Sequence, residues 1–331
     1  MNEVYINSAA QISIQKPLSD EWLANPIHYD APYARSLEPD FRVYFNPLES
    51  RRMGPLFKRA LVTSTEALKK AGLEQPEAII TGTGLGCVEN TELLLGTLCT
   101  EGEELLKPTC FMQSTHNIIS SLIAIHTKSH CYNVTYSHRS ISFDSALFDA
   151  YLQILTGKIG NALVGGHDEL TPSYFSILRK IGYLGVEGMA VSSETAVSYV
   201  VSNNPDNSLC RIAGFKMLYN PSQELLNSTI DTLLNENGLE ANAKPISLSI
   251  ISGFNGNPEN DRPYASLIGG NPLLKQCPQL RYKHIFGENY TSSGFGPLTA
   301  AMNLKENKAE CILYLNHSDG KCWSIILFEK R

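Results

Sequence analysis

The chain has 331 residues, of which 43% are hydrophobic and 18% charged, so it can build a large core, and a disordered chain is excluded. Its formal net charge of −6 argues against the basic surface that a nucleic-acid partner requires. The sequence shows neither a basic, apolar leader nor an apolar run of about 18 residues, which argues against secretion and against a membrane span.

The eight cysteines are scattered along the chain, without a CxxC motif or a cysteine–histidine spacing typical of metal sites. We therefore expect reduced, mostly buried thiols in a cytoplasmic protein. Neither a metal nor a cofactor is predicted.

The first half alternates between strand-like and helix-like segments. Residues 4–14 predict a strand, and residues 17–50, with their prolines and aromatics, predict an irregular excursion. A helix is expected from Arg51, because apolar side chains recur at helical spacing until Gly72. A buried strand follows at residues 78–83. A glycine-rich turn with Gly82, Gly84 and Gly86 comes next, and a further helix runs up to Leu98. The alternation predicts a layered α/β fold.

Residues 134–166 form the most informative stretch. A β-rich segment leads through a sharp turn into an amphipathic helix that Gly157 ends, and a buried strand then enters Gly165 and Gly166. Enzymes often hold a nucleophile at such a turn, since a helix N-terminus offers N–H groups and a positive dipole end to an anion. Ser140 occupies this position.

The second half repeats the alternation. Strands are expected at residues 194–201 and 210–218, a helix at 225–238, and a strand running into a turn at 246–256. After Lys283, a Gly/Ser-rich turn leads to the last helix and two closing strands, at residues 296–306, 311–316 and 323–330.

Six segments, taken together and in order, resemble the ketosynthase branch of the thiolase superfamily, the condensing enzymes that elongate acyl chains on acyl carrier protein. They are RRMGPLFKRALVTSTEALKKAGL, GTGLG, CFMQSTHNIISSL, residues 134–166, NGNPEND and KHIFGENYTSSGFGPLTAAM. The resemblance implies a thiolase-like α-β-α-β-α layered fold of two pseudo-duplicated halves. We expect these halves at residues 1–205 and 206–331, joined in one compact domain.

The same resemblance implies a degenerate catalytic centre. Ser140 lies 25 residues before Gly165. In the active ketosynthases that this chain resembles, the cysteine nucleophile stands at this position. Asn255 and Glu288 stand where the family has its two histidines, whereas Lys283 is retained. Residues 316–320 replace the glycine-rich gate of active members. No residue is therefore predicted to be catalytic, because the histidines would stabilise the developing anions and Glu288 would oppose them.

Degenerate members resemble the chain-length-factor subunits of fatty-acid and polyketide synthases. This implies a non-catalytic partner of an active, cysteine-bearing ketosynthase, with acyl carrier protein bound directly or through that partner. A homodimer is possible in isolation. An aryl polyene-type pathway is one candidate. Such subunits dimerise through the strand near residues 132–136, and four residues are predicted at the tunnel or interface: Thr115, His116, Ile119 and Phe143.

Several interpretations remain open for Ser140. It is interpreted first as a helix N-cap, the commonest use of serine before an apolar helix. The alternative is a divergent active synthase, acyltransferase or decarboxylase that uses Ser140 as a nucleophile, helped by His138 or His167.

Two other features also have structural interpretations. Glu288 is predicted to form a salt bridge with Lys283 or Arg281 in place of a catalytic role. The glycine run is GxGxG and not GxGxxG, so a structural turn is favoured over a dinucleotide site.

Overall fold

A computed structural model describes residues 2–51, 53–239 and 248–331 of the protein. In the first half, the elements are β1 (Tyr5–Ile12), α1 (Pro47–Ser50), α2 (Pro55–Ala71), β2 (Ala78–Gly82), α3 (Val88–Glu101), α4 (Pro108–Gln113), α5 (Ile118–Thr127), β3 (Tyr132–Tyr136), α6 (Ser142–Leu155), β4 (Asn161–Asp168), α7 (Pro172–Lys180) and β5 (Thr195–Ser202). In the second, they are β6 (Cys210–Tyr219), α8 (Gln223–Glu236), β7 (Leu248–Ser252), α9 (Pro258–Gly270), β8 (Gln279–Arg281), α10 (Lys283–Phe286), α11 (Phe295–Lys305), β9 (Cys311–Ser318) and β10 (Cys322–Glu329).

Within these described residues the strands form one ten-stranded mixed sheet in the order β3-β2-β4-β5-β1-β6-β10-β9-β7-β8. The second five strands repeat the order of the first five in reverse, with β6 in the place of β1. The halves meet where β1 pairs with β6, through Tyr5 with Arg211 and Ile6 with Cys210. The division at residues 205 and 206 stays a prediction, and it falls between β5 and β6.

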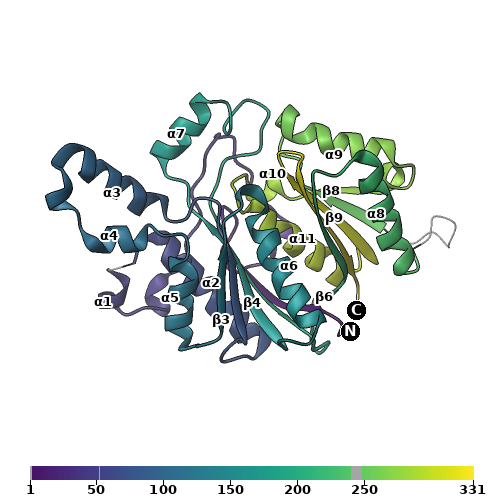
Figure 1. The fold of residues 1–331 in the computed structure, drawn as a ribbon, viewed down its shortest axis with the longest axis horizontal. Helices are drawn as coiled ribbons and strands as arrows, with labels where there is room; N and C mark the ends of the chain where they lie inside the picture. Colours follow the sequence, from purple (N-terminus) through teal and green to yellow (C-terminus); the bar gives the residue numbers. More distant parts are fainter. Residues whose placement is uncertain (1, 52, 240–247) are drawn as a thin grey trace.

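Helices cover both faces of each half-sheet (Figure 1). The helices α6 and α11 lie between the half-sheets, α2 and α5 cover the first from outside, and α8 and α9 cover the second. Neighbouring strand residues point to opposite faces, so Ile80 enters the central core while Ile79 faces α2. In β7, Ile251 likewise enters the central core, and Ile250 joins the core cluster on the outer face of the second half. The predicted layered, thiolase-like α/β fold is confirmed.

The helix expected from Arg51 begins later, at Pro55. Proline is favoured at the first helical position, because its missing N–H would be unpaired there, and Gly54 provides the extended residue before it. The far end was predicted correctly, since Gly72 takes the left-handed conformation, with a φ of 68°, that terminates helices. Arg52 lies outside the described residues, as do residues 246 and 247 of the strand expected at 246–256.

The excursion at residues 17–50 contains short helical turns only, as expected of an irregular segment. Within the described part of the chain, no helix is long and apolar enough to cross a membrane.

A buried ion pair ties the start of α2 to the start of β5. The Arg59 guanidinium donates to both carboxylate oxygens of Glu194, at 2.5 and 3.1 Å, and the side chains are only 2% and 8% exposed. Burial alone would raise the pKa of Glu194, but the Arg59 charge lowers this pKa below its ordinary value. The Ser36 backbone N–H also donates to Glu194, so the pair fixes the excursion too.

Replacing Arg59 with Met should lower the free energy of unfolding by about 3–5 kcal/mol, because it leaves the Glu194 carboxylate buried without its cation. The double variant R59M/E194L should recover most of that loss. Urea denaturation checks both values. The control is Lys69→Met in the same helix: Lys69 is 76% exposed and 4.0 Å from Glu66, so a change of no more than about 0.5 kcal/mol is expected. An equal loss in R59M and K69M would contradict the prediction.

Candidate functional site

The nucleophile-type turn is present and is held by Ser142. A single 3₁₀ turn, Arg139–Ile141, connects the segment after β3 to α6. The Ser142 hydroxyl accepts a hydrogen bond from the His138 N–H at 2.8 Å and donates one to the Arg139 carbonyl at 2.7 Å. Arg139 has a φ of 49°, an uncommon conformation for a residue with a side chain. This tight turn leaves Ser140 half-buried at the edge of a cavity.

Ser140 is not the helix N-cap, so that interpretation was wrong. The N-cap residue of α6 is Ile141, and no side chain caps the helix there. The hydroxyl that satisfies backbone groups at this end belongs to Ser142, two residues further on. Ser140 is therefore turned toward the cavity without a capping function.

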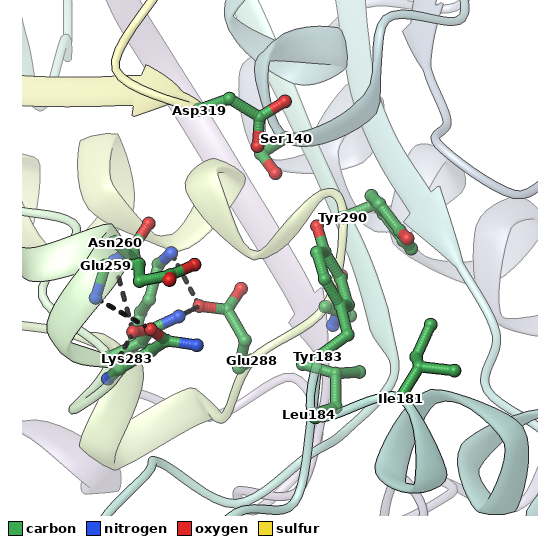
Figure 2. A pocket seen from close by; sticks show the side chains of 14 residues that line it. Ser140, Ile181, Tyr183, Leu184, Glu259, Asn260, Lys283, Glu288, Tyr290 and Asp319 are labelled. Atoms are coloured by element: carbon green, nitrogen blue, oxygen red, sulfur yellow. Dashed lines mark hydrogen bonds and ion pairs between the residues drawn. The ribbon is translucent and has the colours of Figure 1, made fainter.

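A cavity of about 370 Å³ brings the predicted degenerate positions together (Figure 2). Ser140 and Asp319 lie at one end, and Lys283 and Glu288 lie across from them. The lining residues are Ser140, Ile181, Gly182, Tyr183, Leu184, Asn255, Asn257, Glu259, Asn260, Lys283, Glu288, Asn289, Tyr290 and Asp319. They come from both halves of the chain, so the cavity depends on how the halves pack.

Glu288 is the centre of a buried hydrogen-bond network. Its Oε2 accepts from Lys283 Nζ and from Asn255 Nδ2, each at 2.7 Å, and its Oε1 accepts from the Ser292 hydroxyl at 2.9 Å. The predicted salt bridge to Lys283 is confirmed, with side-chain exposures of 4% and 7%. Arg281 does not share it; its guanidinium lies over the Phe254 ring, 4.8 Å from the centroid.

Backbone contacts on both sides fix the position of Glu288. Gly287, with a φ of 82°, lies so close to Ser193 that a Cβ atom would come within 2.3 Å of its hydroxyl. The Glu288 N–H donates to the Val191 carbonyl, and the Glu288 carbonyl accepts from the Ser193 N–H. Asn255 is held likewise, because the Asp261 carboxylate accepts its N–H at 3.0 Å.

His167 cannot act on Ser140. Successive residues of β4 face opposite sides of the sheet. Gly166 faces Phe143 of α6, whereas Gly165 and His167 share the other face, which α2 covers. His167 is fully buried, and burial and then the Arg59 charge lower its pKa to about 3. That version of the serine-nucleophile hypothesis was wrong.

The sequence analysis missed a second buried carboxylate behind Ser140. Asp144 lies one helical turn after Ser140 and is 1% exposed. Asn316 donates from its Nδ2 to the Ser140 carbonyl at 3.1 Å and to Asp144 Oδ2 at 2.9 Å. Burial raises the pKa of Asp144, and side-chain hydrogen bonds from Ser293, Ser324 and Asn316 oppose that shift. A carboxylate on the apolar face of a predicted helix was the available signal.

The gate positions form a rigid hairpin. Strand β9 continues to Ser318, and Asp319 and Gly320 make the turn into β10 with φ values of 53° and 67°. His317 is buried, packs against Tyr264 with tilted rings whose centroids lie 4.1 Å apart, and contacts the Asn260 carbonyl at 2.9 Å. Residues 316–320 are thus paired strand and tight turn.

The glycine turn is structural. The Gly84 and Leu85 N–H groups donate to the Asp168 carboxylate, which occupies the place a phosphate would need. A Cβ at Gly82 would lie 2.5 Å from the backbone of Ser142, and one at Gly84 would lie 2.2 Å from Tyr290 Cβ. The glycines therefore let β2 approach the start of α6 and let Tyr290 approach the turn at Gly84. Tyr290 stacks on Tyr183 with centroids 5.5 Å apart and forms a wall of the cavity.

The four predicted tunnel or interface residues do not line this cavity. Thr115 and His116 are exposed just before α5. Ile119 is buried in the core cluster between α2 and the sheet, and Phe143 is fully buried in the central core against Tyr199. Their role in chain length stays a prediction.

Residues 21–228 match the family model for the N-terminal domain of beta-ketoacyl synthases. This match covers well over half of the chain. The chain belongs to the beta-ketoacyl synthase family.

Solved ketosynthase structures share the fold over the whole chain at 15% sequence identity. The ishigamide ketosynthase/chain length factor superposes with a TM-score of 0.81 and covers 100% of this chain and 99% of its own. A beta-ketoacyl synthase from Burkholderia phymatum STM815 gives 0.81 with complete coverage of both chains. A ketosynthase bound to the hexaketide, in complex with its type II polyketide synthase acyl carrier protein, gives 0.79 over 100% and 99%. A search of curated proteins finds no match.

Asp144→Asn should stabilise the protein at neutral pH by on the order of 1–3 kcal/mol, because it removes a carboxylate whose ionised form is disfavoured by burial. The pKa of Asp144 is raised in the folded protein. The carboxyl group therefore contributes fully to stability below its unfolded pKa of about 3.9. This contribution is lost as the pH rises through the pKa of the folded state. Melting temperatures from pH 4 to 8 should therefore fall more steeply for wild type than for D144N. Asp231→Asn, on the exposed face of α8, should follow wild type; parallel curves for D144N and wild type would refute the prediction.

Proposed function

We propose that the protein is a non-catalytic, chain-length-factor-like subunit that pairs with an active, cysteine-bearing ketosynthase and shapes its acyl or polyketide tunnel. The observation that carries this proposal is the Glu288 network. A buried carboxylate occupies the cavity where the family resemblance predicts a histidine, and it binds Lys283, Asn255 and Ser292. The donors at this end of the cavity are therefore already bonded to a negative charge.

Condensation would be poorly supported in such a cavity. It develops an enolate and an oxyanion, and losing a single oxyanion donor typically costs about 10²–10³ in rate. Here the anion would meet the Glu288 carboxylate, and Lys283 Nζ is held by that carboxylate at 2.7 Å. The Ser140 hydroxyl also lacks the low pKa that lets a cysteine thiol attack a thioester as a thiolate. Among the described residues, no histidine lies within hydrogen-bond distance of this hydroxyl.

The partner and the carrier are proposed by analogy. One structural neighbour is a ketosynthase/chain length factor and another is a ketosynthase in complex with an acyl carrier protein. The free state of all eight cysteines supports the proposed cytoplasmic setting. Fatty-acid and polyketide pathways both suit the proposal, with an aryl polyene-type pathway as one candidate.

The edge of the first half-sheet is the proposed partner surface. Strand β3 is terminal in the sheet and pairs only with β2, so one row of its backbone groups is open to a second chain. The helix α5 packs against it, and α3 and α4 project from the body on the same side (Figure 1). Large apolar side chains are exposed there: Leu93, Leu95, Leu105, Phe111, Met112, Ile125 and Tyr132. Thr115 and His116 lie between α4 and α5, which supports their proposed contact with the partner's tunnel.

The second candidate is an active enzyme that uses Ser140. One observation favours it: Ser140 has no capping function and lies at the cavity beside the N-terminus of α6. Against it stand the Glu288 network and the exclusion of His167.

The purified chain alone should show no turnover with malonyl-carrier protein and an acyl donor, because it lacks the thiolate and both anion-stabilising histidines. Product should form only on adding a cysteine-bearing ketosynthase from the same genome, and Ser140→Ala should leave the rate of the pair unchanged. Mass spectrometry of carrier-bound products checks both. Turnover by the chain alone that S140A abolishes would establish the second candidate instead.

The double variant Phe111→Glu/Met112→Glu should weaken association with that ketosynthase, and with a second copy of this chain, at least tenfold in Kd, or about 1.4 kcal/mol. Both side chains are more than 60% exposed, so the fold should persist while apolar contact is lost. Sedimentation velocity measures the affinities. Ile177→Glu, at a 53% exposed residue of α7, is the matched control. Equal weakening by I177E would place the interface elsewhere.

A further inference from the structure

A thiol and an imidazole face each other next to the Ser140 turn. Cys322 Sγ, at the start of β10, lies 3.8 Å from His138 Nε2, at the start of the 3₁₀ turn. The two residues are 184 positions apart in sequence. This distance suits the long, weak hydrogen bond that a thiol donates to a nitrogen. The fold, and not local sequence, therefore builds a nucleophile–base pair.

Both partners are held in place by structure around them. The His138 N–H is bonded to the Ser142 hydroxyl, which anchors it to the first residue of α6. Cys322 pairs with Ser318 across the β9–β10 hairpin. The Arg139 guanidinium bridges the two elements by an ion pair with Asp319 at 3.1 Å. The pair is thus a fixed feature of the junction between the two halves.

The pair is also accessible beside the cavity. His138 is exposed and Cys322 is partly exposed. Their near neighbours Ser140 and Asp319 both line the cavity and lie together at one end of it (Figure 2).

The thiol needs its base. Burial, and then the Asp319 charge, raise the pKa of Cys322, so the resting group is the protonated thiol. A protonated thiol attacks a thioester only if a neighbouring group accepts its proton. His138 does so when its Nε2 is unprotonated.

We propose that Cys322 and His138 form an acyl-accepting site for thioesters, distinct from the degenerate Ser140 position. His138 Nε2 takes the Sγ proton as sulfur bonds to the thioester carbonyl carbon. The bond from that carbon to the departing sulfur then breaks, and the leaving thiolate takes the proton from His138. The products are an acylated Cys322 and a free thiol, with no oxidant or reductant required. Family membership suggests the thioester class, whereas transfer itself needs neither condensation nor a partner subunit.

The test uses the purified full chain and the acetyl thioester of N-acetylcysteamine, with acylation of each cysteine followed by peptide mass spectrometry. Cys99, exposed on α3, is the internal control. General-base assistance predicts acylation of Cys322 at least about 10-fold faster than that of Cys99. His138→Ala should bring Cys322 down to the rate of Cys99, and added imidazole should restore much of the difference.

Equal rates at Cys322 and Cys99 would overturn the proposal. So would an unchanged Cys322 rate in H138A, because thiol exposure alone would then explain the labelling. Either result concerns this chain and a small thioester only, so it leaves the pairing with a ketosynthase to be judged by its own assays.

Discussion

The arrangement of the cavity depends on one buried carboxylate. Glu288 is 5% exposed, and a charge so far from water persists only if surrounding groups donate to it. Lys283, Asn255 and Ser292 do so from three separate segments, after β8, after β7 and before α11. Satisfying Glu288 therefore fixes the relative positions of three connections that converge on one side of the cavity.

The opposite side of the cavity is fixed by a separate carboxylate. Asn316 of β9 donates to Asp144 and to the Ser140 carbonyl, and so attaches the turn in the first half to a strand in the second. The central core beneath it is shared by both half-sheets, which meet where β1 pairs with β6. The cavity is thus bounded by polar contacts that cross between the halves, while apolar packing beneath holds the halves together.

Much of the fold, and part of the cavity, could be predicted from sequence because the signals were local. The buried strand at residues 162–164, the stop at Gly72 and the helix after Ser140 depend on neighbours a few residues away. The salt bridge of Glu288 to Lys283 spans five residues and was within reach as well. What could not be predicted depends on contacts across the fold. Asp144 with Asn316 and Cys322 with His138 are separated by 172 and 184 residues.

The N-cap interpretation of Ser140 failed for a different reason. Two serines lie within three residues of each other, and composition alone does not decide which hydroxyl turns back to the chain. The conformation of Arg139 decides it, since a φ of 49° brings Ser142 under the His138 N–H. A left-handed arginine is disfavoured locally, and so it could not be anticipated from propensity.

The buried Lys283–Glu288 pair bears on how the cavity keeps its shape. Replacing such a pair by apolar residues is often neutral or stabilising, so net stability is a weak reason to keep it. Its donors and acceptors are directional, however, and they hold the lining residues in one arrangement. The paired strand and tight turn at residues 316–320 act in the same sense, because they exclude a flexible gate. A cavity held in one arrangement on both sides agrees with the proposed role, in which this subunit would contribute shape to a partner's tunnel.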